Sequence, residues 1–290
     1  TSILLTLSNF LSQVVLASVP GGNTQVAIKI IPRGEKNGSL IAREQQILRT
    51  VRECPFISHL YSAFYSQEEA YFIMEYLSGG SLDALMKRSE SMSRESVSFY
   101  TAELVCGLQF LHGHNIVHRD LKPQNIMLDA SGHIRIIDLG IARDGVTASK
   151  VLHGVTGTLR YMAPEVLLRR GYGRAVDWWS LGILVCRIGA GCHPFYSGPI
   201  RKMIQDAITT EEPTIPASTH DDVKDLVRNL LRKNPAERLG VCGNIRQHLL
   251  FSRIDWEELE QRKASPPSPS TETVLEKEAQ QLPKDSRVVH

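Results

Sequence analysis

The chain lacks an excess of either charge. Its 290 residues include 33 Lys and Arg against 31 Asp and Glu, a formal net charge of +2. Proteins that bind nucleic acid usually carry a strongly basic patch or stripe, and no basic run of this kind is present. The composition therefore gives no reason to expect nucleic acid as a partner.

The chain also lacks a cysteine framework. It has five cysteines, an odd number without the spacing of a disulfide-rich domain or a zinc site. This pattern predicts reduced thiols in the core of an intracellular protein, most simply a cytoplasmic one. They are Cys54, Cys106, Cys186, Cys192 and Cys242, mostly among apolar neighbours.

No long hydrophobic run is present. Residues 1–20 are apolar but interrupted by Ser, Thr, Asn and Gln, and no basic residue precedes them. A membrane helix needs about 20 consecutive apolar residues, and a secretory signal starts with a charged segment. We therefore expect strands here, with neither a membrane span nor a signal peptide. With 42% hydrophobic residues, the whole chain can bury a large core.

The most informative segment is residues 118–125, with the sequence His-Arg-Asp-Leu-Lys-Pro-Gln-Asn; Asp-Leu-Gly follows at 138–140. Asp120 can accept the proton of an attacking hydroxyl, and Lys122 can hold the transferring phosphate. Asn125 and Asp138 can ligate magnesium. A His-Arg-Asp tripeptide alone would be a weak signal, but the longer pattern with the later Asp is specific.

These segments resemble those of protein kinases, and the resemblance extends to about Lys263. The lysine at 122 resembles the serine/threonine branch. Residues 157–165 resemble the end of an activation segment, and residues 177–182 resemble the buried helix that supports the catalytic loop. The implied fold is α+β with two lobes: a small β-rich N-lobe with one helix at 1–77, and a larger, mainly helical C-lobe at 78–263.

The resemblance also implies an activity: ATP- and magnesium-dependent phosphorylation of protein serine or threonine hydroxyls. Thr158 would flank the substrate hydroxyl together with Lys122. A protein substrate and an upstream kinase are the expected partners. Glu165, in Ala-Pro-Glu, would form a structural ion pair with Arg238.

In the small lobe, apolar residues at 26, 28 and 30 alternate around Lys29 and predict a strand. The resemblance implies that Lys29 holds the ATP phosphates and that Glu44 orients it. Glu44 lies on a predicted helix that starts at Ser39, with Leu40, Ile47, Leu48 and Val51 on one side. Taken singly, Lys29 and Glu44 would be an ordinary solvated lysine and an ordinary exposed acid.

Residues 71–77 are aromatic and β-branched and end at Ser-Gly-Gly, which fits a buried strand that enters a hinge. The resemblance implies that Met74 is the gatekeeper beside adenine and that Glu75 and Leu77 offer backbone groups to its edge. Without that context, Met74 would be a core methionine. The implied nucleotide pocket comprises Val14, Ala27, Met74, Glu75, Leu77 and Met127.

Residues 248–256 and Pro266-Pro267 resemble the start of the C-terminal tail of the AGC group, with a ribosomal-protein-kinase-related member as the nearest match. No aromatic residue follows Trp256, so the group's hydrophobic docking motif is missing. Residues 264–290 are Ser/Pro-rich and then polar, and we predict that they are disordered.

Several positions depart from the kinase pattern. The three glycines that normally close over the phosphates align with Leu7, Asn9 and Ser12, which predicts low nucleotide affinity. Phe of Asp-Phe-Gly is replaced by Leu139. The activating threonine aligns with Gly154. The candidates for a nearby phosphate are Thr147, Ser149 and Thr156, which would meet Arg119 and Arg143.

The acids that read basic substrates in the AGC group align with Ser81, Gln124 and Arg187. We therefore predict no strong selection for arginine upstream of the phosphoacceptor. Asp83 could compensate in part, and Arg187 could simply pair with a nearby acid.

Two other functions remain open. A pseudokinase would keep the fold as a binding or scaffold module with little or no turnover. The retention of every charged catalytic residue favours the enzyme. A small-molecule kinase is disfavoured by Lys122 and by the Ala-Pro-Glu segment.

Overall fold

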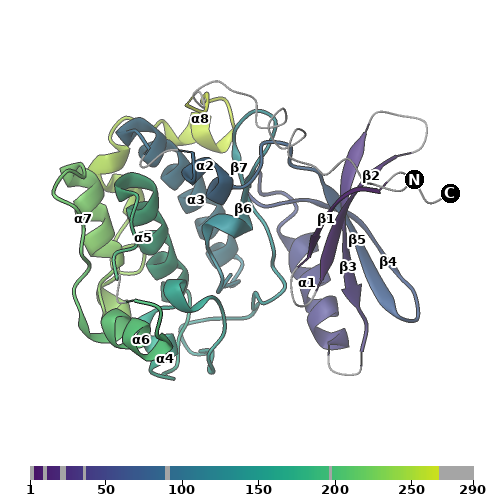
Figure 1. The fold of residues 1–290 in the computed structure, drawn as a ribbon, viewed down its shortest axis with the longest axis horizontal. Coiled ribbons are helices and arrows are strands. Elements are labelled where there is room, and N and C mark those ends of the chain that lie inside the picture. Colours follow the sequence, from purple (N-terminus) through teal and green to yellow (C-terminus); the bar gives the residue numbers. More distant parts are fainter. Residues whose placement is uncertain are drawn as a thin grey trace.

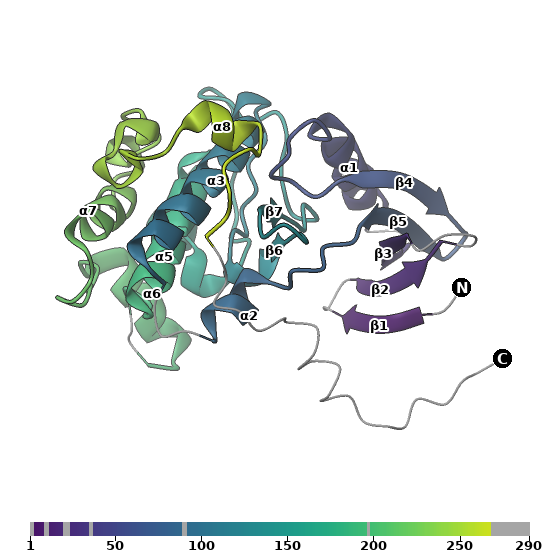
Figure 2. The same ribbon diagram turned by 90° about the horizontal axis from the view of Figure 1, so that it is seen from above.

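The described part of the chain folds into two lobes, with the strands of one sheet and a single helix in one and most helices in the other (Figure 1). The computed structural model describes residues 3–8, 12–19, 24–34, 37–88, 92–195 and 198–267. The view from above shows the same division (Figure 2). The predicted α+β, two-lobed kinase fold is confirmed.

The small lobe is built on a five-stranded antiparallel sheet with the order β1-β2-β3-β5-β4. Its central strands are rich in β-branched residues, which fit a pleated, half-buried surface. β3 lies in the middle and pairs with β2 on one side and β5 on the other. The strands are β1 (Ile3–Ser8), β2 (Gln13–Ser18), β3 (Gln25–Pro32), β4 (Leu60–Tyr65) and β5 (Glu69–Glu75).

Helix α1 (Gly38–Thr50) packs beside the sheet. It begins one residue before the predicted start at Ser39. Ile47 and Leu48 are buried as expected, but Leu40 is exposed and Ile41 takes the buried position instead. The prediction for Leu40 was wrong because a helical period gives the spacing of the apolar face and leaves its phase ambiguous at the helix end.

The large lobe is mainly helical. Ser93 caps its long helix α3 by accepting a hydrogen bond from the backbone N–H of Ser96 at 3.2 Å, as expected for a serine N-cap. Two short strands form a hairpin between the lobes. The elements are α2 (Leu82–Met86), α3 (Arg94–Gly113), β6 (Ile126–Leu128), β7 (Ile134–Ile136), α4 (Pro164–Leu167), α5 (Ala175–Ala190), α6 (Arg201–Thr210), α7 (Asp221–Leu230) and α8 (Trp256–Glu260).

Helix α5 forms the centre of the large lobe, where it packs against α3 and α7. Its two adjacent tryptophans, Trp178 and Trp179, are almost fully buried. The helix ends at Gly191, whose φ of 68° lies in the left-handed region that glycine adopts at little cost. This rigid helix is the platform on which the catalytic loop rests.

Two further predictions concern the C-terminal segment and the absence of a membrane-spanning helix. Of the segment 264–290 that we predict to be disordered, only residues 264–267 are described, so this stays a prediction. Within the described residues, no helix has the length and apolar character needed to cross a bilayer.

Candidate active site

Lys29 contacts residues of both lobes. It lies on β3, where its neighbours across the sheet are Val14 on β2 and Phe72 on β5. Its Nζ is 2.6 Å from Oε1 of Glu44 and 2.8 Å from Oδ1 of Asp138. The structure therefore brings together three of the predicted site residues, from β3, from α1 and from the segment after β7.

Electrostatics keep Lys29 and Asp138 charged, whereas burial raises the pKa of Glu44. Burial alone would lower the pKa of Lys29, but the charges of Glu44 and Asp138, and its hydrogen bonds to both, raise it above its ordinary value. Burial opposes ionisation of Asp138 as well, yet the charge and hydrogen bond of Lys29 lower the pKa of that carboxyl. An ammonium and an ionised Asp138 are thus present at neutral pH.

A second cluster forms around Asp120. Its Oδ2 is 2.6 Å from Nζ of Lys122, and its Oδ1 accepts the backbone N–H of Thr158 at 2.8 Å. Lys122 also donates to Oγ1 of Thr158 at 2.9 Å. The predicted catalytic residues Asp120, Lys122 and Thr158 therefore lie in direct contact.

Asp177 on α5 holds the catalytic loop through its backbone. Its two carboxylate oxygens accept the backbone N–H groups of His118 and Arg119, both at 2.9 Å. Arg119 has a φ of 72°, an uncommon conformation for a residue with a Cβ that persists only when its surroundings enforce it. Asp177 supplies that enforcement, as expected of the helix at 177–182.

Asn125 and Asp138 are the predicted magnesium ligands. The amide of Asn125 donates to the backbone oxygen of Asp120 at 2.9 Å, so its Oδ1 is left as an oxygen donor. Only Oδ1 of Asp138 bonds Lys29, which leaves its Oδ2. The two segments are joined by a hydrogen bond from the N–H of Ile137 to the carbonyl of Asn125 at 2.9 Å. Two hard oxygen ligands match the preference of magnesium.

The predicted adenine pocket draws on both lobes and the connection between them. Ala27 pairs with Met74 across β3 and β5. The N–H of Glu75 already donates to the carbonyl of His59 at 3.0 Å, so its carbonyl is the backbone group left for a ligand. Leu77 is buried. From the large lobe, Met127 on β6 is half-buried and bridges to Ser81.

The activation segment is ordered around Arg119. Its guanidinium donates to the carbonyl of Ile141 through Nε at 2.7 Å and to the hydroxyl of Tyr172 at 3.3 Å. Leu152 and Tyr172 exchange both backbone hydrogen bonds, at 2.7 and 2.9 Å. Gly154, where a phosphorylated threonine would stand, has a φ of 93°. Arg119 therefore has protein partners in place of a phosphate.

Sequence reasoning missed one buried arginine, Arg135 on β7. Its Nε is 3.3 Å from Oε1 of Glu75, and its Nη2 is 3.9 Å from Oδ2 of Asp129. The same Glu75 oxygen accepts the backbone N–H of His59 at 2.8 Å. Arg135 thereby holds the strand that enters the hinge. A charged residue within the apolar pattern Ile-Arg-Ile was the available signal.

The residues at the predicted substrate-reading positions, Ser81, Gln124 and Arg187, make other contacts. Ser81 caps α2 by accepting from the N–H of Ala84 at 3.1 Å, and Gln124 donates to Asp83 at 3.0 Å. Arg187 donates to the hydroxyl of Tyr161 and forms no ion pair with any described residue. The alternative in which Arg187 pairs with a nearby acid therefore has no support in this part of the chain.

The comparisons with known proteins agree with this geometry. The sequence model of the protein kinase domain family matches residues 11–251. Rat (Rattus norvegicus) and mouse (Mus musculus) protein kinase C delta type are each 36% identical over 259 residues, which is 88% of this chain and 38% of theirs. Protein kinase C of Drosophila melanogaster is 34% identical over 262 residues, 88% of this chain and 35% of its own length.

The chain thus spans little more than a third of the curated relatives it matches. The similarity to protein kinase C agrees with the AGC-group resemblance, and the narrower likeness to a ribosomal-protein-kinase-related member stays a prediction. The family match covers most of the chain, and the cluster of Lys29, Glu44 and Asp138 agrees with it. The chain therefore belongs to the protein kinase family.

Proposed function

We propose that this chain transfers the γ-phosphoryl group of ATP to serine or threonine hydroxyls of a protein substrate, with magnesium. The observation that carries the proposal is the contact of Lys122 with both Asp120 (2.6 Å) and Thr158 (2.9 Å). In this arrangement a base and a cation face the same point, where an incoming hydroxyl and the transferring phosphate would meet.

The reaction assigns a role to each residue. Asp120 orients the substrate hydroxyl and takes its proton as the oxygen attacks the γ-phosphorus, while the bond to the β-phosphate oxygen breaks and ADP leaves. Lys122 stabilises the charge on the transferring group. Lys29, held by Glu44, binds the α- and β-phosphates. Asn125 and Asp138 would hold magnesium, which would supply positive charge next to the phosphate oxygens.

The adenine ring would lie between Val14 and Ala27 above and Met127 below, against Met74. Its edge would meet the carbonyl of Glu75 and the backbone of Leu77. We also infer an intracellular, cytoplasmic setting, since all five cysteines are free.

Phosphorylation of the activation segment is not required for order in this proposal. Arg119 is already bonded to Ile141 and Tyr172, so an upstream kinase would act at Thr147, Ser149 or Thr156 to modulate rather than to assemble the segment.

The decisive experiment compares the chain with Asp120→Asn in a phosphotransfer assay on a mixed peptide library. The near-isosteric amide keeps one acceptor oxygen but cannot take the proton, so the rate should fall at least about 100-fold. A thermal melt of both proteins serves as the control for folding. Undiminished turnover by Asp120→Asn would contradict the proposed base.

A pseudokinase is the second candidate, favoured by the absence of glycine at Leu7, Asn9 and Ser12. It predicts no turnover by the unmodified chain even at millimolar ATP. Magnesium-dependent ATP binding measured beside Asp138→Asn separates the cases further. The enzyme requires binding that this variant weakens, whereas a module that has lost nucleotide binding shows no difference.

A further inference from the structure

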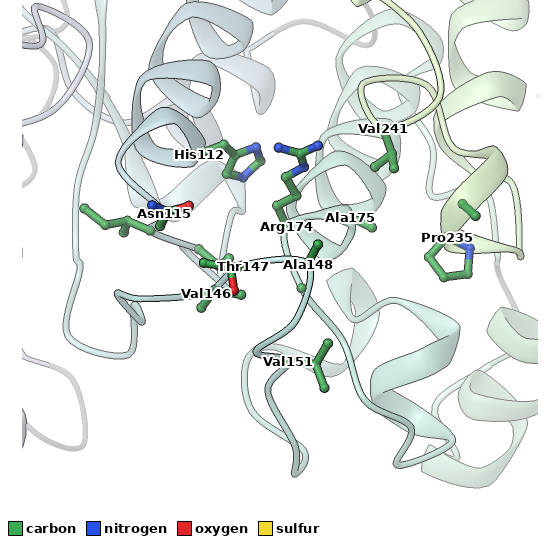
Figure 3. A pocket seen from close by; sticks show the side chains of 14 residues that line it. His112, Asn115, Val146, Thr147, Ala148, Val151, Arg174, Ala175, Pro235 and Val241 are labelled. Atoms are coloured by element: carbon green, nitrogen blue, oxygen red, sulfur yellow. The ribbon is translucent and has the colours of Figure 1, made fainter.

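A cavity of about 470 Å³ lies in the large lobe, outside the residues assigned to ATP (Figure 3). It is bounded by the end of α3, the start of α5, the activation segment at 146–151, and residues 235–241. Four polar side chains line it among mainly apolar walls: His112, Asn115, Thr147 and Arg174. The apolar lining includes Ile116, Val117, Val146, Val151, Ala175 and Val241.

His112 brings an unpartnered ring nitrogen to this cavity. Its side chain is only 5% exposed, and its Nε2 is 2.8 Å from Oδ2 of Asp177. Burial opposes ionisation of Asp177, but its hydrogen bonds, with that to His112 first, lower the pKa of the carboxyl. An ionised carboxylate only accepts, so Nε2 carries the proton. The buried Nδ1 has no hydrogen-bond partner among the described residues.

Arg174 brings an unpaired positive charge. It is exposed, stands directly before α5, and makes no ion pair or side-chain hydrogen bond with any residue that the structure describes. In the view of Figure 3 its guanidinium is drawn at the same end of the cavity as the His112 ring. The positive end of the α5 dipole adds to the attraction for an anion. The first-turn acid of α5, Asp177, is directed to the catalytic loop instead.

These features define one kind of ligand. The apolar walls favour a hydrocarbon body, and Arg174 favours a carboxylate. The unpartnered Nδ1 of His112 favours a hydroxyl close to that carboxylate, because a hydroxyl can donate or accept a hydrogen bond. We propose that this cavity binds a small apolar hydroxycarboxylic acid. A phosphate ester fits less well, because Arg174 is the one arginine or lysine among these lining residues.

One residue, Asp177, connects the cavity to the catalytic loop. The same Asp177 that accepts from His112 also accepts the backbone N–H groups of His118 and Arg119. The ligand would therefore contact His112, which bonds the residue that holds the loop bearing Asp120. It would share no residue with the nucleotide.

The test is isothermal titration calorimetry of the whole chain, without ATP, against three matched probes below their micelle concentrations. They are 3-hydroxydecanoate, decanoate and 1,3-decanediol, of which the second lacks the hydroxyl and the third lacks the carboxylate. We expect 3-hydroxydecanoate to bind at least tenfold more tightly than either. Equal affinities for all three, or no binding up to roughly 1 mM, would overturn the proposal.

Variants locate the binding. Arg174→Gln should weaken 3-hydroxydecanoate at least fivefold and leave the diol unchanged. Arg201→Gln is the matched control, an exposed arginine at the start of α6 and outside the cavity. His112→Gln keeps a donor toward Asp177 but removes Nδ1, so it should abolish the preference for 3-hydroxydecanoate over decanoate.

A thermal melt would reveal misfolding of His112→Gln. One further variant tests the site without changing His112. Ala148→Phe fills the cavity from an exposed wall position and should abolish binding of all three probes. Unchanged binding in Arg174→Gln and Ala148→Phe would place the ligand elsewhere and reject the site. Because no step involves phosphotransfer, the outcome is independent of the proposed kinase activity.

Discussion

Arg238 and Glu165 form a bidentate ion pair in the core of the large lobe, with Nη1 to Oε1 at 2.8 Å and Nη2 to Oε2 at 3.1 Å. Arg238 is fully buried and also donates to the carbonyl of Ala175 at 2.8 Å. The pairing predicted from the sequence is confirmed. It ties the end of the activation segment to the start of α5 and to the turn at 235–238.

Breaking this pair from one side should unfold the protein more easily. Glu165→Ala or Arg238→Ala leaves an uncompensated buried charge, which costs about 3–5 kcal/mol. The measurement is the free energy of unfolding in urea. Glu237→Ala, which removes an exposed acid next to Arg238 in the chain, is the control and should change little. A loss under about 1 kcal/mol in the core variants would show that the pair is not needed for stability.

Glycine in the β1–β2 loop should tighten ATP binding. The strand register places Leu7 opposite Val14 and Ser8 opposite Gln13, so residues 9–12 connect β1 to β2. Leu7 lies in β1 and Ser12 is buried, while Asn9 lies outside the described residues. Glycine at all three positions should lower the ATP dissociation constant at least several-fold, because backbone amides could approach the phosphates.

Fluorescent-nucleotide titration measures this effect. The control adds glycine at Val19 and Thr24, which lie between β2 and β3 and are joined by a hydrogen bond from the N–H of Val19 to the carbonyl of Thr24 at 2.9 Å. Low-micromolar ATP affinity in the unmodified chain, or no gain from the three glycines, would mean that the loop does not limit binding.

Peptide substrates should show no selection for arginine two or three residues before the phosphoacceptor. Asp83 is engaged by Gln124 at 3.0 Å and by Lys87 at 2.7 Å, and Arg187 adds a positive charge that repels an incoming guanidinium. An oriented peptide library measures the preference. Gln124→Glu with Arg187→Glu should create it, and Ser81 is left in place because it caps α2. Strong arginine selection by the unmodified chain would reject this account.

Arg135 should act as a positioning residue for ATP through Glu75. Arg135→Met leaves the Glu75 carboxylate near the hinge without its buried cation, so the KM for ATP should rise several-fold while kcat changes less. Arg262→Met is the control, because Arg262 pairs with Asp129 but not with Glu75. Arg135→Lys should restore part of the affinity. If Arg135→Met and Arg262→Met changed kcat and the KM for ATP to the same extent, the effect would be a general loss of stability.

The hydrogen bonds of Asp177 should make stability sensitive to acid. Its pKa is lower in the folded chain than the ordinary value of 3.8, so the unfolded chain binds the proton more readily. Its contribution is fully present above about pH 4 and is lost as the pH falls through the folded value. Asp177→Asn should cost at least about 1.5 kcal/mol at pH 7.

Denaturant unfolding between pH 7 and 3 tests the sign. The difference between the wild-type chain and Asp177→Asn should narrow toward the acid end. A difference that is constant over this range would assign the effect of the substitution to packing instead of charge.

The site residues that could be identified from the sequence are those within short, characteristic segments. Asp120, Lys122 and Asn125 lie within one loop, and their mutual contacts follow from local geometry. The β-strand pattern around Lys29 and the cap at Ser93 are also local signals, because backbone periodicity and capping act over a few residues. These features determined the fold class, the chemistry and the order of the lobes along the chain.

Contacts between distant segments depended on packing that no local pattern encodes. Arg135 meets Glu75, Arg119 meets Tyr172, and His112 retains an unpartnered Nδ1 only because strands and helices far apart in the chain come together. The buried face of α1 likewise includes Ile41 where Leu40 was predicted. Side-chain partners over such separations are selected by tertiary close packing, since each buried polar group must find whichever partner the folded chain brings within reach.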